Sequence, residues 1–126
     1  MRLILPIPPT LNHAYLAFIE EASWKTLSWM RKNNWRMPPP NEKIILRVWI
    51  FWPDRRRRDT DNVLKLLLDA LKGVAFVDDC MVLPRVMDFG VDYERPRIEI
   101  ELSLKNDFED FSEEVSRSLQ HEIRCA

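Results

Sequence analysis

Two neighbouring stretches decide the fold of this chain, KIILRVWIFW (Lys43–Trp52) and DNVLKLLLDALK (Asp61–Lys72). The first is rich in β-branched and aromatic side chains on both alternating faces, which is typical of an inner strand covered on both sides. The second is apolar except for one stripe at spacings of three and four residues, made of Asn62, Lys65, Asp69 and Lys72. Such a pattern predicts a mostly buried helix, which Gly73 ends as a C-cap glycine.

Weaker patterns on either side complete the predicted sheet. Short apolar or alternating runs predict strands over Leu3–Leu5, Met81–Phe89 and Arg97–Leu102. Proline cannot donate to a strand ladder, so Pro84 suggests an edge strand or a bulge in the second of these. The turn-rich segment 90–96 is expected to join the last two strands as a hairpin.

Helical spacing marks the rest of the chain. Residues 14–33 are expected to form a helix, with one apolar stripe traced by Leu16, Ile19, Ser23, Leu27 and Met30. The element order predicts an α/β fold: a small mixed β-sheet of about four strands, flanked by helices.

The C-terminal part, residues 103–126, is expected to be a helical extension of a single domain over residues 1–102. Its apolar residues recur at helical spacing, and its acids come early while His121 and Arg124 come late, as the helix dipole favours. The apolar residues are Phe108, Phe111, Val115, Leu119 and Ile123. This acidic tail could dock on the body, cover a dimer surface or keep non-specific DNA away.

Composition narrows the class of protein. The chain has 126 residues, 46% hydrophobic and 31% charged, with a net charge of −1, as expected of one globular domain. No apolar run approaches the ~20 residues that span a bilayer, and the N-terminus lacks a signal-peptide pattern. Cys80 and Cys125 show no zinc-ligand spacing. We therefore expect a cytoplasmic protein without a membrane segment or a small-molecule cofactor.

One uninterrupted basic run, Arg55–Arg58, stands out against the nearly neutral total. Because salt confines surface fields to ~8–10 Å, a local cationic patch on a neutral protein can still bind phosphates. A solvated surface without a partner is an equally good interpretation of the run taken alone.

Three carboxylates flank the buried helix. Asp59 and Asp61 are two residues apart and can point the same way just before the helix begins. Asp79 precedes the next strand and would lie near them if that strand neighbours Lys43–Trp52. Three converging carboxylates suit a hard cation such as Mg²⁺ or Mn²⁺.

Lys65 lies one turn after Asp61 on the polar stripe, where it could stabilise charge on a reacting phosphoryl group. Structural roles explain the same residues as well. Asp59 or Asp61 could cap the helix, Lys65 and Asp69 could be a surface pair, and Asp78 and Asp79 could belong to a turn.

The spaced motif RRRDTDNVLK (Arg56–Lys65), LDAL (Leu68–Leu71) and DDCMV (Asp78–Val82) closely resembles the RusA family of Holliday-junction resolvases. The loop PPTLN (Pro8–Asn12) also looks like the opening loop of that family. The resemblance is strong from Arg55 to Val82, looser over Met1–Leu102, and absent from Ser103 onward.

This resemblance implies a small α/β homodimer that cuts four-way DNA junctions with a divalent metal, by paired symmetric hydrolysis in recombination and repair. Proteins of this type are commonly encoded by phages or prophages. Motif by motif, the resemblance makes Asp59, Asp61 and Asp79 the catalytic metal ligands and Lys65 a catalytic residue. The supporting residues would be Asp78 and Asn62, and the DNA-binding residues Arg55, Arg56, Arg57, Arg58 and Asn12.

Other functions stay open on the sequence. One is a metal-dependent nuclease for flaps or other branched DNA. Another is a non-catalytic dimeric DNA-binding protein in which the carboxylates are structural. Three carboxylates do not decide between one metal ion and two. An exposed member of the five tryptophans could wedge a junction open, although core or dimer-interface positions explain them better.

Overall fold

The computed structural model describes residues 2–9, 14–56 and 58–105. The chain runs through β1 (Leu3–Leu5), α1 (Tyr15–Lys32), β2 (Ile44–Trp52), α2 (Thr60–Leu71), the short 3-10 turn η2 (Asp79–Met81), β3 (Val82–Val91) and β4 (Arg97–Leu104). The elements predicted over residues 3–102 are all present within about two residues of their expected bounds. The predicted helical extension over 103–126 lies outside the described residues from residue 106 onward. The strand that was expected to end the domain at residue 102 continues to Leu104.

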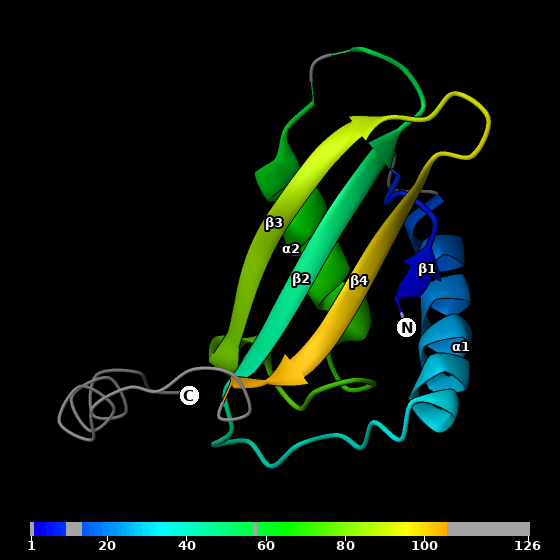
Figure 1. Ribbon diagram of the computed structural model, residues 1–126. Helices are drawn as coiled ribbons and strands as arrows, with labels where there is room; N and C mark the ends of the chain where they lie inside the picture. Colours follow the sequence, from blue (N-terminus) through cyan, green and yellow to red (C-terminus); the bar gives the residue numbers. More distant parts are fainter. Residues whose placement is uncertain (1, 10–13, 57, 106–126) are drawn as a thin grey trace, which may run out of the picture.

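The four strands form one mixed sheet in the order β1-β4-β2-β3, which confirms the predicted α/β class (Figure 1). β2 and β3 are parallel and are joined by α2, while β4 is antiparallel to both β1 and β2. A parallel pair needs a crossover of this kind, because a short turn can only reverse the chain. Both helices lie behind the sheet in Figure 1, α2 behind β2 and β3, and α1 beside β1 and β4.

The expected hairpin between the last two strands is wrong. β4 pairs with β2 and β1, so β2 lies between β3 and β4, and segment 92–96 passes over the end of β2 (Figure 1). The backbone N–H of Asp92 donates to the carbonyl of Trp52 at that crossing, at 2.8 Å. A turn pattern in the sequence shows only that the chain reverses direction, not which strands pair. β2, the most apolar strand, takes the central position between β3 and β4.

One face of β2 supplies the centre of the hydrophobic core, and Ile45 on the opposite face is also fully buried. Ile44, Leu46, Val48, Ile50 and Trp52 are buried against the helices together with Leu67 and Leu71 of α2. On the other face, Arg47, Trp49 and Phe51 are half-buried, and within the described residues neither helix packs over them. The sequence predicted an inner strand covered on both sides, and in the described part of the chain the two helices cover only one of them.

The buried stripe of α1 is rotated from the predicted one. Phe18, Ala22, Thr26 and Trp29 face the core, whereas Leu16 is 77% and Leu27 47% exposed. Thr26 fits there because its hydroxyl donates to the carbonyl of Ala22, which satisfies the only polar atom of that side chain. Apolar side chains occur on more than one stripe of this helix, so spacing alone could not select the buried one.

β3 is the exposed edge of the sheet, as Pro84 suggested. Its pairing with β2 shifts by one residue between Val48 and Trp49, so Met87 is the extra residue of a bulge. Several apolar side chains on this strand stay exposed: Val86, Met87, Phe89 and Val91. Among the described helices none is long and apolar enough to cross a membrane.

Candidate active site

The N-terminal end of α2 presents the first two carboxylates. Asp59 is the N-cap residue, and its Oδ1 accepts a hydrogen bond from the backbone N–H of Asp61 at 2.9 Å. Asp61 lies in the first turn, where the helix dipole favours an anion. Both residues are exposed. The structural interpretation of Asp59 as a cap is thus confirmed, and its second oxygen and the carboxylate of Asp61 still face solvent.

The basic run before α2 contains two kinds of arginine. Arg58 is held: its Nη1 lies 2.7 Å from Asp54 Oδ1, and its guanidinium lies 5.1 Å from the centre of the Trp52 ring. Arg55 and Arg56 are exposed. Arg56 Nε lies 3.4 Å from Asp54 Oδ2, but 82% of the Arg56 side chain stays open to solvent. Arg57 lies outside the described residues. The exposed pair can therefore meet a polyanion without leaving a packed position.

Asp54 organises this loop and was not singled out from the sequence. Its carboxylate bonds to Arg58 and accepts a hydrogen bond from the backbone N–H of Arg56 at 2.9 Å. The hydrogen bond from Arg58, more than any other contact, lowers the pKa of Asp54 to about 2. The i,i+4 spacing of the two residues was a signal for this pair.

A cavity of about 450 Å³ lies between this loop and the end of β3. The walls come from the end of β2, from the loop and from the edge strand, and they include Trp52, Asp54, Arg56, Arg58 and Phe89. Phe89 is 63% exposed, which the alternation of the sequence did not indicate because the bulge changes the facing of the residues after it. Cationic and aromatic side chains therefore meet around a cavity that Thr60, the first residue of α2, also lines.

Lys65 lies one turn along α2 and is exposed, as are the other members of the predicted polar stripe, Asn62, Asp69 and Lys72. The packing face of the helix is made of Val63, Leu67, Ala70 and Leu71. Lys65 is therefore free of any structural role in the core, which leaves its ammonium group available near Asp61.

A second pair of carboxylates lies at the C-terminal end of α2. Asp78 Oδ1 accepts a hydrogen bond from the backbone N–H of Asp79 at 2.7 Å and lies 3.6 Å from Lys72 Nζ. The turn interpretation of Asp78 is thus confirmed. The two carboxyl groups also hydrogen-bond to each other, which raises the pKa of Asp79 and lowers that of Asp78.

The three predicted metal ligands do not converge within one subunit. β3 is indeed the neighbour of β2, but it is parallel, so Asp79 precedes the pair Ile44–Val82 while Asp59 follows the other end of β2. The 12 residues of α2 separate the two pairs by about 18 Å at 1.5 Å per residue. Within residues 2–9, 14–56 and 58–105, no three acidic, histidine or cysteine side chains gather closely enough to hold a metal ion.

Because of this separation, a single subunit does not bring Asp59, Asp61 and Asp79 together around one cation. Each end of α2 offers two of the carboxylates that the sequence singled out, Asp59 with Asp61 and Asp78 with Asp79. Asn12, which the family resemblance assigned to DNA binding, lies outside the described residues.

Four of the five tryptophans have structural positions. Trp29 and Trp52 are buried in the core, Trp49 is half-buried under Arg2, and Trp35 Nε1 donates to the carbonyl of Ala75 at 2.9 Å. Trp24 on α1 is 57% exposed, with Lys25 Nζ 5.8 Å from its ring centre.

Comparison with known proteins gives one match of consequence. The model of a protein family described as endodeoxyribonuclease RusA matches residues 11–103, which include Asp59, Asp61, Lys65, Asp78 and Asp79. No curated protein matches the chain. Because the match covers most of the chain, including both ends of α2, this protein belongs to the RusA family of endodeoxyribonucleases.

Proposed function

We propose that this protein cleaves four-way DNA junctions by hydrolysing one phosphodiester on each of two opposing strands. The observation that carries the proposal is the exposed N-terminal turn of α2, where Asp59, Asp61 and Lys65 stand beside Arg55 and Arg56 within the residues matched to the family. Phosphate contacts by the arginines would position the backbone, and the carboxylates would face the bond to be cut.

We further propose Mg²⁺ as the cofactor, with Mn²⁺ as a substitute. Exposed carboxylate oxygens are the donors that these hard cations prefer. When bound, such an ion would polarise the phosphate and activate water. The role of Lys65 is then to stabilise negative charge on the phosphoryl oxygens, which its exposed position one turn after Asp61 supports.

A homodimer reconciles this cofactor with the separation of the carboxylates. If two copies meet along β3 with the strands antiparallel about a two-fold axis, the start of one β3 lies beside the end of the other. Asp79 of one copy then approaches the N-terminal end of α2 in its partner. Each site would combine Asp59, Asp61 and Lys65 of one subunit with the partner subunit's Asp79.

The surface of β3 supports this arrangement. It is the free edge of the sheet, and four of its apolar side chains are exposed: Val86, Met87, Phe89 and Val91. A two-fold dimer also presents two equivalent sites to a junction that is itself roughly two-fold.

Cleavage of a synthetic four-way junction, beside a flap substrate and a linear duplex, tests the activity. The proposal expects Mg²⁺-dependent, paired cuts in the junction and little cleavage of the other two. Preferred cutting of the flap would identify a different branched-DNA nuclease. Junction binding without cleavage under any divalent cation would identify a DNA-binding protein.

Subunit complementation tests the shared site. In a mixed dimer of Asp59→Asn and Asp79→Asn subunits, a shared arrangement leaves one site with all its carboxylates, so nicking of one strand should return. The matched control is a mixture of Asp59→Asn with Asp61→Asn, where both sites keep a defect and no activity should return. Equal inactivity of the two mixtures would show that each subunit contains its own complete site.

A further inference from the structure

Where β2 and β3 end, each face of the sheet carries an aromatic side chain. Paired residues of neighbouring strands point to the same side of a sheet, so Phe89 lies on the side of the helices with its partner Ile50. Gly90 pairs with Phe51, whose ring lies on the opposite, open face. The two rings therefore lie at the same end of the sheet in different surroundings.

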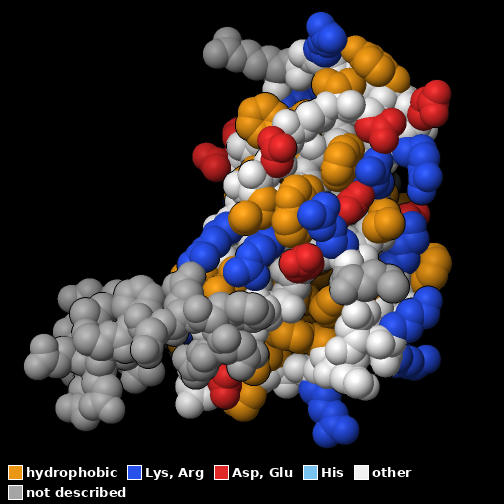
Figure 2. All heavy atoms as spheres, in the orientation of Figure 1, with side chains coloured by type: hydrophobic (Ala, Val, Ile, Leu, Met, Phe, Trp, Pro, Cys, Tyr) orange, Lys and Arg blue, Asp and Glu red, His pale blue; other side chains and the backbone are white. Residues whose placement is uncertain are grey.

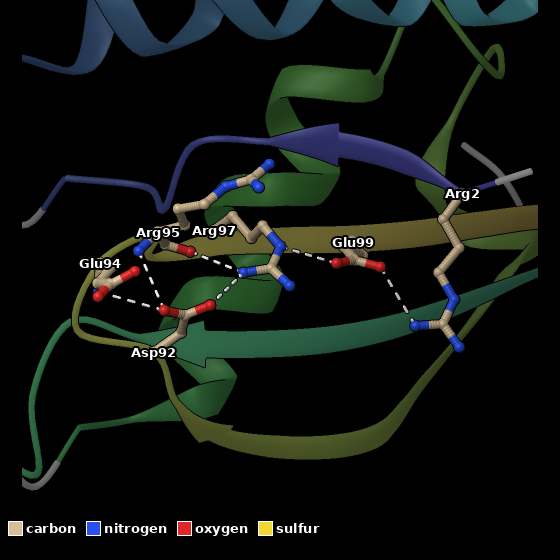
Figure 3. Close-up of polar contacts among 6 residues, drawn as sticks. All are labelled: Arg2, Asp92, Glu94, Arg95, Arg97 and Glu99. Atoms are coloured by element: carbon tan, nitrogen blue, oxygen red, sulfur yellow. Dashed lines mark hydrogen bonds and ion pairs between the residues drawn. The ribbon is translucent and has the colours of Figure 1, made fainter.

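On the open face, guanidinium groups of the protein itself cover the rings. Arg97 donates to Glu99 at 2.7 Å, and Arg2 donates to the same carboxylate at 3.2 Å (Figure 3). Arg97 lies 3.9 Å from the centre of the Phe51 ring, and Arg2 lies 3.6 Å from that of Trp49. Figure 2, which views this face, shows basic, acidic and apolar side chains interspersed. A ligand would have to displace these contacts to reach either ring.

On the side of the helices, the ring of Phe89 is open to solvent. The side chain is 63% exposed and borders the cavity of about 450 Å³ between the end of β3 and the loop from β2 to α2 (Figure 1). This volume lies within the roughly 300–1,000 Å³ of pockets that hold small organic groups. A planar group can therefore reach this ring from the cavity.

The loop side of the same cavity supplies positive charge. Among its lining residues are three arginines, Arg55, Arg56 and Arg58, and one acid, Asp54. Asp54 lies 2.7 Å from Arg58 and 3.4 Å from Arg56, so its one negative charge is shared between two of the three cations. The two carboxylates that begin α2 are not among the lining residues. The lining thus favours an anion on the loop side and a planar apolar group beside β3.

A nucleotide combines these two properties. Its phosphate is an anion, and its base is a planar group that stacks on aromatic side chains with little regard to sequence. Bases inside a duplex are already stacked, and taking one out costs least where the base is unpaired or the strand is single. The cavity therefore fits a nucleotide of single-stranded or branched DNA.

We propose that this cavity is a subsite for one unstacked base, which stacks on Phe89 while Arg55 and Arg56 bind the neighbouring phosphates. The inference rests on the proposed function, because the subsite would hold a base next to the phosphodiester that Asp59 and Asp61 face. It also gives a reason for a preference for branched DNA, since a branch point yields an unstacked base at lower cost than a duplex does.

The subsite is compatible with the proposed dimer. A second β3 would pair along the edge of the sheet, in its plane. Side chains of a strand stand roughly perpendicular to that plane, and the ring of Phe89 borders the cavity on the side of the helices. One residue can therefore belong to the edge strand and still offer its ring to a base.

Binding of two short single strands to the full-length protein, without divalent metal, tests the subsite. One strand carries adenine bases, and the other is the same sugar–phosphate chain without bases. Because their phosphates are equal, the ratio of the two affinities measures what the bases contribute. The parent should bind the strand with bases roughly 5- to 150-fold more tightly. Phe89→Leu should lose most of this ratio, and Phe89→Trp should keep it.

Two controls separate the ring of Phe89 from other contributions. Tyr93 is 66% exposed at the same end of the sheet but is not among the lining residues, so Tyr93→Leu should keep the ratio. Arg55→Ala with Arg56→Ala should weaken binding of both strands alike and also keep the ratio, because both strands offer the same phosphates.

Three results would overturn the subsite. An affinity ratio near one for the parent would show that only phosphates are bound. A ratio that survives Phe89→Leu would remove this ring from the contact. A Phe89→Leu protein whose oligomeric state differs from that of the parent in sedimentation would assign the residue to the subunit interface. Junction cleavage is not measured, so each of these results leaves the proposed nuclease activity standing, and a protein without that activity could still show the ratio.

Discussion

Aspartate residues near the two ends of α2 have different hydrogen-bond partners. At the N-terminal end, Asp54 and Asp59 are satisfied by cations and backbone N–H groups, and the pKa of Asp54 is lowered to about 2. At the C-terminal end, Asp78 and Asp79 hydrogen-bond to each other, and the pKa of Asp79 is raised. Among the described residues, Lys72 is the only cation in an ion pair at this end, and its Nζ lies 3.6 Å from Asp78 Oδ1.

The difference shows why neither end is a complete site. The N-terminal end can bind the anionic DNA backbone beside Asp59 and Asp61. One oxygen of Asp59, however, already accepts the hydrogen bond that caps the helix. The second end gathers negative charge that a cation would relieve. In the proposed function the two ends meet, because a second copy of the chain would bring Asp79 to the N-terminal end of α2 without unfolding the helix.

The largest expected effect comes from removing a carboxylate at either end. Asp59→Asn, Asp61→Asn and Asp79→Asn should each reduce junction cleavage by more than the roughly 10²–10³-fold that one charge-stabilising donor contributes. Binding of the junction should stay intact or tighten, because less negative charge faces the phosphates. Rate and affinity measurements on the same junction would show this.

The asparagine variants also separate chemistry from folding. Asparagine caps a helix about as well as aspartate does, so Asp59→Asn should keep its hydrogen bond to the Asp61 N–H and its melting temperature. Glu20→Gln, on the exposed side of α1, is the matched control and should cleave at the normal rate. A variant among the three that cleaves normally would be removed from the site.

Lys65→Ala should slow cleavage by roughly 10²–10³-fold with little change in junction affinity. Its stability should change by no more than about 0.5 kcal/mol, because the side chain is exposed and off the packing face of α2. Thermal denaturation and single-turnover rates would be compared with those of Lys25→Ala on α1. A large loss of stability together with the loss of rate would instead assign Lys65 a structural role.

The two kinds of arginine at the first end should separate in a salt titration. Replacing Arg55 and Arg56 by alanine should weaken junction binding and reduce the slope of log affinity against log salt by about 0.9 for each lost phosphate contact. Cleavage at saturating enzyme should change little. Replacing Arg31 and Arg36 by alanine, both exposed, provides a control with the same change in net charge. An unchanged slope would mean that this loop faces away from DNA.

The smallest effect concerns the pH dependence of the Asp54–Arg58 pair. The pKa of Asp54 is lower in the folded protein, at about 2, than its ordinary value of 3.8, so the pair adds stability above that ordinary value and loses it as the pH falls toward 2. Asp54→Asn should therefore be less stable than the parent at pH 5, and the difference should shrink from about pH 4 downward. Urea denaturation at several pH values would measure it. A difference that persists at pH 2 would have another origin.

Local patterns in the sequence were sufficient to predict the described helices and strands and to identify the family motif. The alternation of Lys43–Trp52, the polar stripe of α2 and the edge position signalled by Pro84 depend on periodicities of neighbouring residues, which a chain shows before it folds. The motif from Arg56 to Val82 identified the family by the same kind of information. Side-chain exposure along α2 followed directly from its stripe.

Only the tertiary structure decided what depends on contacts between distant segments. β4 inserts beside β2 and turns an expected hairpin into a crossing, while the sheet keeps one face away from both helices and α1 buries Phe18 instead of Leu16. Above all, the parallel direction of β3 sends Asp79 to the far end of α2. Strand order and direction are set by burial of whole faces against one another, and no local spacing contains that choice.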